Sequence, residues 1–178
     1  YDTEGMTEDA IAAARVVKHA VAAESADASL LTIKVAGEKD GKRCRLDAET
    51  EAQLAAYIAE IKDAGVRTAL VNTDPDRFSC QVEIYYDPML VAETVETACR
   101  EAVREYIENL PFNGEYTNMA LVDALQAVEG VRIVEFKGAT RVAADETVVV
   151  PIDARCVPAA GYFTMEDVQL TLKAYGNE

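Results

Sequence analysis

The sequence predicts an α+β fold built as two small layered units, with helices packed on mostly antiparallel or mixed sheets. Stretches with apolar residues three or four apart, typical of amphipathic helices, are interspersed with stretches in which every second residue is apolar, typical of half-buried strands. Half of the 178 residues are hydrophobic, which supplies a core and excludes a wholly disordered chain. We expect three segments: residues 1–28, 29–112 and 113–178.

Residues 1–28 are expected to form a helix and a linker. Over residues 7–24 one stripe of apolar side chains recurs at helical spacing, formed by Ile11, Ala14, Val17 and Val21. Thr7 fits the N-cap, and the small residues at 25–29 fit a linker. The chain begins with Tyr1 rather than Met, which indicates a fragment or a processed product.

The first α+β unit is expected to open with a hairpin and a helix. A strand is predicted at 30–36, a tight turn at Asp40-Gly41 and a short return strand at 42–46. Asp47 fits the N-cap of the following helix, whose apolar residues are Leu54, Ile58 and Ile61. Gly65 is placed as the C′ glycine that ends this helix.

The rest of this unit is predicted as two strands and the longest helix. A strand at 66–73 is followed by a turn at 74–76 and by the clearest strand, 78–86, which alternates apolar and polar residues as a half-buried antiparallel strand does. A helix is expected over 87–110. Its apolar stripe is Val95, Cys99, Ala102, Tyr106 and Leu110, and its solvent-facing line is Glu96, Arg100, Arg104 and Glu108.

A break at 111–115 is taken as the boundary to the second unit, although the two units could pack as one body. A helix is predicted over 118–129, carried by Leu121, Leu125 and Val128 and ended by Gly130. Strands are predicted at 131–137, 147–156 and 168–174. Gly161 is expected to turn the chain so that Tyr162 and Phe163 enter a core.

Charge and cysteine content limit the possible partners. Seventeen basic and 32 acidic residues give a net charge of −15, which disfavours nucleic acid and anionic membranes as main partners. No apolar run is long enough to span a bilayer. The cysteines are widely and irregularly spaced, which favours buried thiols in a reducing compartment over a disulfide framework: Cys44, Cys80, Cys99 and Cys156.

No catalytic, cofactor-binding or metal-binding motif is found, so the chain is not expected to be an enzyme. The single histidine, His19, is interpreted as a surface or packing residue. Asp74 and Asp76 fit a solvated turn better than a cation site, and 145–146 is interpreted in the same way. The basic residues around the predicted hairpin fit a charged edge strand, with an acidic neighbour as the alternative: Lys39, Lys42, Arg43 and Arg45.

Three tyrosines are interpreted as exposed and are candidate interface anchors, although ordinary half-buried packing is favoured for each one taken singly: Tyr85, Tyr116 and Tyr175. Interfaces use tyrosine because it combines a large apolar ring with a polar hydroxyl.

Several phrases, in this order, resemble the C-terminal half of the baseplate J-like family of phage tails and contractile injection systems. The phrases are LLTIKVAGEKDGKRCRL with the helix AETEAQLAAYIAEIKDAGV, then RTALVNTDPDRFSCQVEIYYDP, ETVETACREAVREYIENLPFNGEY, AVEGVRIVEF and PAAGYF. The resemblance covers roughly residues 7–175. The chain lacks the N-terminal half that members of this family usually carry. The resemblance rests on element order and hydrophobic spacing, and it transfers no functional residue.

The resemblance implies a structural part of a tail baseplate. Such a part would be made in the bacterial cytoplasm and would then join other baseplate or tail proteins, with a homo-oligomer as a further option and without nucleic acid or membrane as partners. Two alternatives stay open from the residues themselves. One is a small-ligand-binding or regulatory module. The other is an enzyme with scattered carboxylates such as Asp74 and Asp76, for example a nucleotidyltransferase-like or hydrolytic activity.

Overall fold

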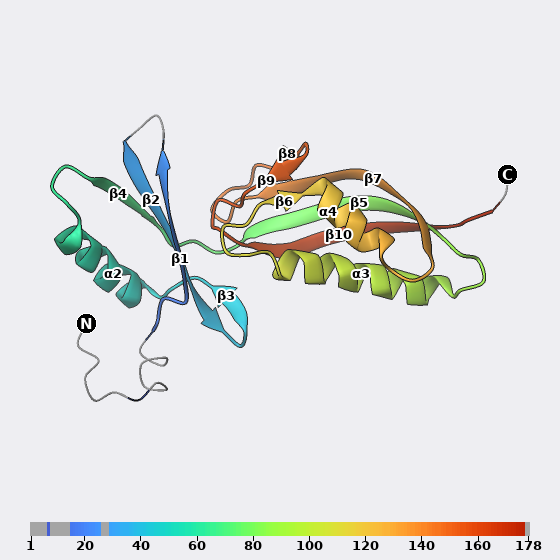
Figure 1. Ribbon diagram of the computed structural model, residues 1–178, viewed down its shortest axis with the longest axis horizontal. Coiled ribbons are helices and arrows are strands. Elements are labelled where there is room, and N and C mark those ends of the chain that lie inside the picture. Colours follow the sequence, from blue (N-terminus) through green and yellow to red (C-terminus); the bar gives the residue numbers. More distant parts are fainter. Residues whose placement is uncertain (1–6, 8–14, 26–28, 177–178) are drawn as a thin grey trace. The chain divides into compact units, whose positions relative to one another are not determined.

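The computed structural model describes residues 7, 15–25 and 29–176, and these residues form the predicted α+β fold (Figure 1). They contain three helices, 25% helix and 42% strand, with mostly antiparallel or mixed sheets on which helices pack. The chain divides into two compact units, residues 1–74 and 75–178. The division falls after Asp74 rather than at 111–115, because the strand that follows Asp74 pairs with strands near the C-terminus.

Unit 1 is organised around one central strand. Strand β2 pairs antiparallel with β1 and β3 and parallel with β4. The hairpin predicted at Asp40-Gly41 is confirmed: both residues have positive φ, 54° and 74°, as a tight two-residue turn requires. The elements are β1 (His19–Ser25), β2 (Leu30–Lys39), β3 (Lys42–Cys44), α2 (Ala48–Ile61) and β4 (Arg67–Val71).

The helix predicted over residues 7–24 is wrong for its second half. Residues 15–18 have no regular structure and His19–Ser25 form β1, which pairs with β2 along its whole length. Along β1 the side chains of His19 and Val21 are half-buried whereas Ala20 and Ala22 are exposed, so the segment also satisfies a strand alternation. Pairing with a neighbouring strand outweighs the helix propensity of alanine here. Residues 8–14 lie outside the described residues.

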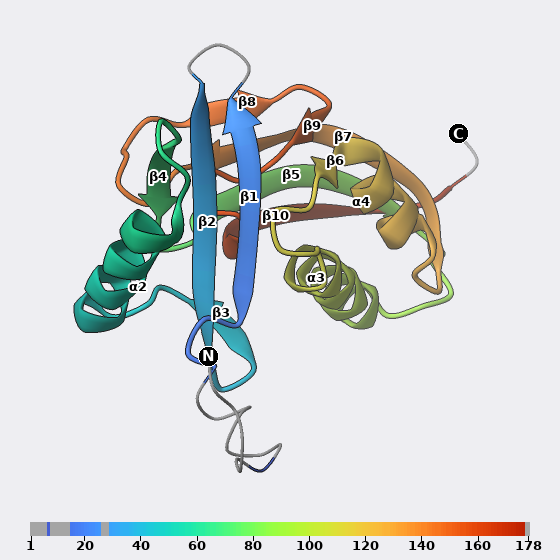
Figure 2. The same cartoon turned by 60° about the vertical axis from the view of Figure 1, so that its left-hand side comes forward.

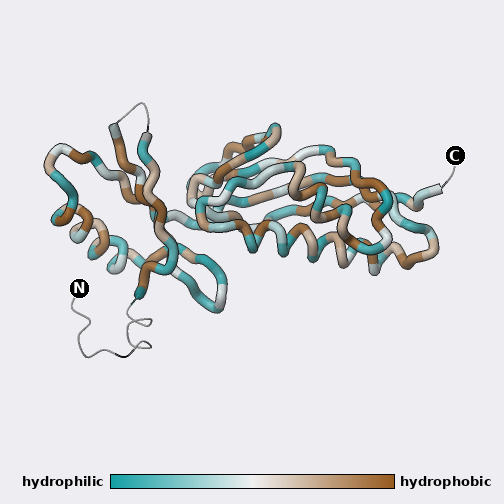
Figure 3. Tube along the Cα trace, in the orientation of Figure 1, coloured by the Kyte–Doolittle hydropathy of each residue, from teal (hydrophilic) through white to brown (hydrophobic). Residues whose placement is uncertain are grey.

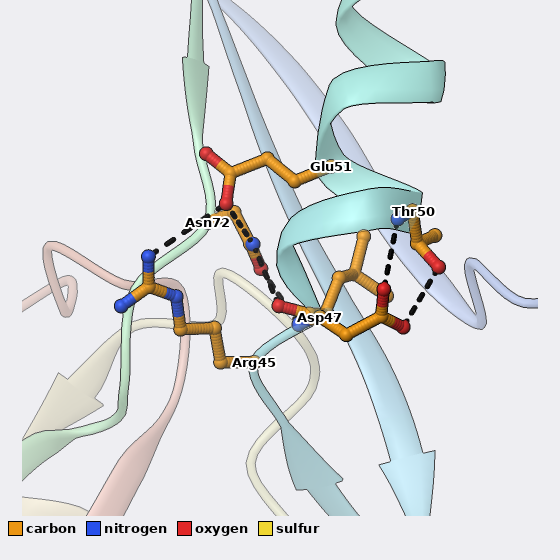
Figure 4. Close-up of polar contacts among 6 residues, drawn as sticks. Arg45, Asp47, Thr50, Glu51 and Asn72 are labelled. Atoms are coloured by element: carbon orange, nitrogen blue, oxygen red, sulfur yellow. Dashed lines mark hydrogen bonds and ion pairs between the residues drawn. The ribbon is translucent and has the colours of Figure 1, made fainter.

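Helix α2 begins as predicted and ends earlier than predicted. The Asp47 carboxylate accepts hydrogen bonds from the Thr50 backbone N–H at 2.9 Å and the Thr50 hydroxyl at 2.8 Å (Figure 4). The Thr50 N–H is the main reason that the pKa of Asp47 lies below its ordinary value. The helix ends at Ile61 with Lys62 as C-cap, so Gly65 is not its C′ residue; with φ 89° it turns the chain toward β4.

A buried amide joins the end of β4 to the start of α2. Asn72 accepts a hydrogen bond from the Leu46 backbone N–H at 2.8 Å and donates to the Leu46 carbonyl at 3.1 Å and to Glu51 at 2.7 Å. Figure 4 shows Glu51 between Asn72 and Arg45, whose guanidinium lies 3.7 Å from the Glu51 carboxylate. Because Asn72 is almost fully buried, these bonds replace lost water contacts and fix the position of the helix.

Unit 2 contains a four-stranded sheet in the order β10-β5-β7-β8. The predicted strand at 78–86 is confirmed as β5, which pairs antiparallel with β7 and parallel with β10. A two-stranded sheet joins β6 and β9. The elements are β5 (Asp76–Tyr86), α3 (Ala92–Glu108), β6 (Tyr116–Thr117), α4 (Asn118–Gln126), β7 (Val131–Val142), β8 (Val150–Ile152), β9 (Arg155–Cys156) and β10 (Phe163–Ala174).

Helices α3 and α4 pack on the same side of this sheet (Figure 2). They cover the face of β5 formed by Phe78, Cys80, Val82 and Ile84, which are buried. The buried residues of α3 recur every four positions: Val95, Cys99, Val103 and Ile107. The predicted stripe was therefore correct at its first two residues, while Ala102, Tyr106 and Leu110 are only half-buried.

The predicted turn at Gly161 is confirmed, and the predicted burial of the cysteines is confirmed for two of the four, Cys80 and Cys99. Gly161 has a φ of 91° and precedes the buried aromatic pair Tyr162 and Phe163. Burial raises the pKa of the Cys80 thiol to about 12 and that of Cys99 to about 11. None of the four cysteines forms a disulfide, and the other two, Cys44 and Cys156, are half-buried.

We predict that Asn72→Ala lowers the free energy of unfolding of unit 1 by about 2 kcal/mol, because the Leu46 N–H and carbonyl lose their partner in a buried place. Urea unfolding followed through amide signals of β2 and β4 measures this change. The control is Gln53→Ala, which removes an exposed amide from α2. Equal stability of the two variants would show that Asn72 does not fasten α2 to β4.

Candidate protein interface

Large exposed apolar residues occur in the loop that leads from β5 into α3. Figure 1 shows this loop at one end of unit 2. The connecting residues 88–91 can be followed in Figure 3 as a mainly hydrophobic stretch. Met89 is 89% exposed and Val91 68% exposed. We call this surface the apolar tip and define it by Pro88, Met89, Leu90, Val91, Ile133 and Tyr175.

Ile133 and Tyr175 are distant in sequence from residues 88–91, and the pairing of strands in the sheet places them near this loop. Ile133 lies on β7 and pairs with Tyr85 on β5. Tyr175 follows β10, and its backbone N–H donates to the Tyr86 carbonyl at 2.8 Å. Pro88, Ile133 and Tyr175 line a shallow cavity of about 330 Å³ together with Asp87 and Arg132.

Asp87 holds the connecting loop in one conformation. Its carboxylate accepts from the Met89 backbone N–H at 3.0 Å and from Arg132 at 2.6 Å. Its own N–H donates to the Gly130 carbonyl at 2.8 Å, and its carbonyl accepts from the Leu90 N–H at 2.9 Å. The Met89 N–H, followed by Arg132, holds the pKa of Asp87 below its ordinary value. The apolar tip is therefore preformed.

Gly130 gives the loop the space it needs. A Cβ at this position would lie 2.2 Å from the Leu90 side chain, and the backbone φ of 86° also disfavours other residues. The predicted helix over 118–129 is too long: α4 ends at Gln126 with Ala127 as its C-cap, so Gly130 lies in the turn before β7 and does not end the helix. The close approach of Gly130 to Leu90 depends on the arrangement of β5, β7 and α3, so it could not be seen in the sequence.

The three tyrosines that were candidate anchors differ in their exposure. Tyr175 is exposed and belongs to the apolar tip. Tyr85 is half-buried, with the Lys173 ammonium 5.5 Å from its ring centre. The interpretation of Tyr116 as exposed is wrong: it is fully buried, with its ring centre 4.9 Å from that of Phe78. Burial keeps the pKa of its hydroxyl well above the ordinary value.

The interpretation of Asp76 as a solvated turn residue is also wrong. Asp76 is fully buried at the start of β5 and accepts three hydrogen bonds: from the Ala159 N–H at 2.8 Å, the Ala160 N–H at 3.1 Å and Arg141 at 3.1 Å. Asp74 is exposed and belongs to unit 1. Both Asp76 oxygens are occupied, so the role that its contacts indicate is to fasten the loop before β10 to β5 and β7.

The other residues considered in the sequence, namely His19, the basic residues of the hairpin and residues 145–146, lie on different elements and do not form one site. His19 lies on β1, with its Nε2 3.6 Å from the Glu38 carboxylate. Arg45 has an acidic neighbour in Glu51, while Lys39 and Lys42 are exposed at the β2–β3 hairpin. Residues 145–146 are exposed, as expected.

A group of ion pairs that the sequence analysis did not anticipate lies across the sheet of unit 2. Glu83 on β5 lies 2.7 Å from the Lys173 ammonium on β10 and 3.5 Å from that of Lys137 on β7. The hydrogen bond from Lys173 is the main cause that lowers the pKa of Glu83. Only the pairing of three distant strands brings these residues together, so no sequence spacing could have indicated it.

Comparison with known proteins gave no match: no family model and no curated protein matches this chain. Within the described residues, no group of three or more His, Cys, Asp and Glu side chains is arranged to hold a metal ion. None of the described helices is both long and apolar enough to cross a membrane.

We predict that Asp76→Asn lowers the free energy of unfolding of unit 2 by about 3 kcal/mol. The substitution leaves the Arg141 guanidinium without its anion and removes at least one acceptor from the 159–160 backbone. Urea unfolding monitored through α3 and β7 measures the effect. Asp74→Asn is the control and should change stability by less than about 0.5 kcal/mol; equal effects would contradict the assigned role.

We predict that the loop at 88–91 loosens in acid. Since the folded state lowers the pKa of Asp87 below 3.8, its bonds to Met89 and Arg132 are complete above that pH and are lost as pH falls through the lowered value. The Met89 amide signal in NMR should titrate with a midpoint below 3.8. Asp87→Asn should abolish this step. A Met89 amide that titrates equally in the variant would exclude Asp87 as the cause.

Proposed function

We propose that this chain is a structural component of a phage tail baseplate, or of a related contractile injection system, and that it acts through protein–protein contacts. The observation that carries the contact role is the apolar tip. Contiguous apolar surface held in a fixed conformation and framed by polar residues is typical of sites that another protein covers.

The geometry of the tip favours binding at low entropic cost. Asp87 and Gly130 already fix the backbone of the loop, so less conformational freedom is lost when a partner packs against it. Full burial of an exposed Met, Leu or Val side chain contributes about 1.5–3 kcal/mol each. Met89 and Val91 therefore suit the role of anchors, and the exposed Tyr175 is a further candidate.

The baseplate assignment is supported by the resemblance in element order. The first quoted phrases form β2, the Asp40-Gly41 turn, β3 and α2, and the next form β4 and β5 up to Asp87. The later phrases contain nearly all of α3, the turn that follows α4, the first half of β7 and the turn at Gly161 that precedes β10. An acidic surface also keeps such a component soluble before assembly.

The test begins with the gene neighbourhood, where the proposal predicts tail tube, sheath or spike genes. The chain is then co-expressed with the products of those genes, and the mixture is examined by size-exclusion chromatography and negative-stain imaging. The proposal predicts a defined complex of the native chain. The variant Met89→Ser/Val91→Ser should weaken this complex at least about tenfold, because two apolar anchors are lost.

The matched control is Val148→Ser/Val149→Ser. These two valines are 62% and 59% exposed and precede β8, near the end of the sheet opposite the tip. The control should assemble like the native chain. If no tail protein binds the native chain, the baseplate assignment is wrong; if both variants bind equally well, the contact does not use the apolar tip.

A further inference from the structure

A second surface of unit 2 has the shape and charge of a docking site. Helices α3 and α4 leave a groove of about 340 Å³ on their outer side. We call it the helical groove: its floor is Ala102, Tyr106, Leu110 and Ala124, and its rim includes Glu105 and Asn109. The two alanines, one from each helix, keep the floor low enough for another element to approach closely.

The helical groove is preformed by a hydroxyl that joins the two helices. The Tyr106 hydroxyl accepts from the Thr117 backbone N–H at 3.1 Å and donates to the Thr117 carbonyl at 3.2 Å. Thr117 is the N-cap of α4, and its side chain accepts from the Ala120 N–H at 3.2 Å. The start of α4 is thereby fixed against α3, so the groove is present before any partner binds.

The lining of the groove favours a helix over an extended segment as its occupant. Four of the seven lining residues lie on α3 and α4, whose interior backbone groups are already paired within each helix, and the other three, residues 109–111, follow α3 directly. An extended peptide would have to leave its own N–H and carbonyl groups without protein partners at such a surface. A helix satisfies its own backbone and can place apolar residues between α3 and α4.

The charge of the surroundings selects a basic partner. Helix α3 contains five glutamates and two arginines, and both arginines are paired, Arg100 with Glu96 and Arg104 with Glu101. Glu105 stands exposed on the rim of the groove, and Asp123 precedes Ala124 on α4. Unit 2 as a whole has 18 acidic and 8 basic residues, so its field attracts cations from a distance.

We infer that the helical groove binds a basic amphipathic helix of a partner protein, with the apolar face of that helix on Ala102, Tyr106 and Ala124 and its lysines or arginines near Glu105. This site shares no residue with the apolar tip and does not depend on the baseplate assignment. The chain therefore has two separate docking surfaces, one apolar and one apolar with an acidic rim.

The probe is a synthetic amphipathic helix of about 18 residues, with leucine and alanine on one face and lysine on the other. Its affinity for the full chain is measured by isothermal titration calorimetry in about 0.15 M salt, where long-range attraction is screened. Ala124→Leu, which fills the groove, and Glu105→Lys, which reverses the rim charge, should each weaken binding at least about tenfold.

Matched controls make the same chemical changes elsewhere: Ala55→Leu on the exposed side of α2 and Glu93→Lys in the first turn of α3. Both should bind the probe within about twofold of the native chain. Circular dichroism checks folding, and Ala102→Leu replaces Ala124→Leu if the latter unfolds. Absent binding, or equal loss in the groove variants and the controls, would overturn the inference; equal loss would indicate unspecific attraction to an acidic protein.

Discussion

Unit 2 depends on how β5 is held at both of its ends. Asp76 at the start accepts three hydrogen bonds that fasten the 159–160 loop and β7, and Asp87 after the end fixes the loop into α3. Between them one face of the strand supplies buried residues to the core beneath α3 and α4. The same strand thus sets the position of the core, of the C-terminal strand β10 and of the apolar tip.

Local signals in the sequence were sufficient for much of this arrangement. The alternation in β5, the Asp47 cap, the Asp40-Gly41 turn and Gly161 each have a short-range physical cause that is visible in neighbouring residues. The alanine-rich segment before β2 was predicted to be a helix because its apolar residues lie three or four positions apart, as they do on one face of a helix. In the structure, residues 19–25 are a strand because β2 offers a pairing edge, which is a non-local effect.

The functional surfaces were harder to predict for the same reason. Tyr175 was a candidate anchor, but Pro88 and Ile133 line a cavity with it only because β5 pairs with β7 and β10. Tyr116 and Asp76 carry polar groups in segments that look like turns, yet the topology buries both. The helical groove depends on the contact between Tyr106 and Thr117, eleven residues apart, which no periodicity indicates.

The chain combines a strongly acidic surface with an apolar tip, and these features act at different distances. Net charge keeps copies apart and attracts basic partners over about a Debye length, roughly 8 Å at physiological salt. Apolar contact becomes favourable only after surfaces meet and exclude water. This combination of long-range charge repulsion and short-range apolar contact suits a protein that stays monomeric in solution and then binds at a specific position in an assembly.

The most direct test of this account is hydrogen–deuterium exchange of the free chain compared with the chain in the proposed complex with tail proteins. The account predicts that amides of residues 88–91 and 132–133 exchange markedly more slowly in the assembly, while residues 145–149 are unchanged. Identical exchange at 88–91 in both states would contradict the claim that the preformed apolar tip is the surface through which the protein acts.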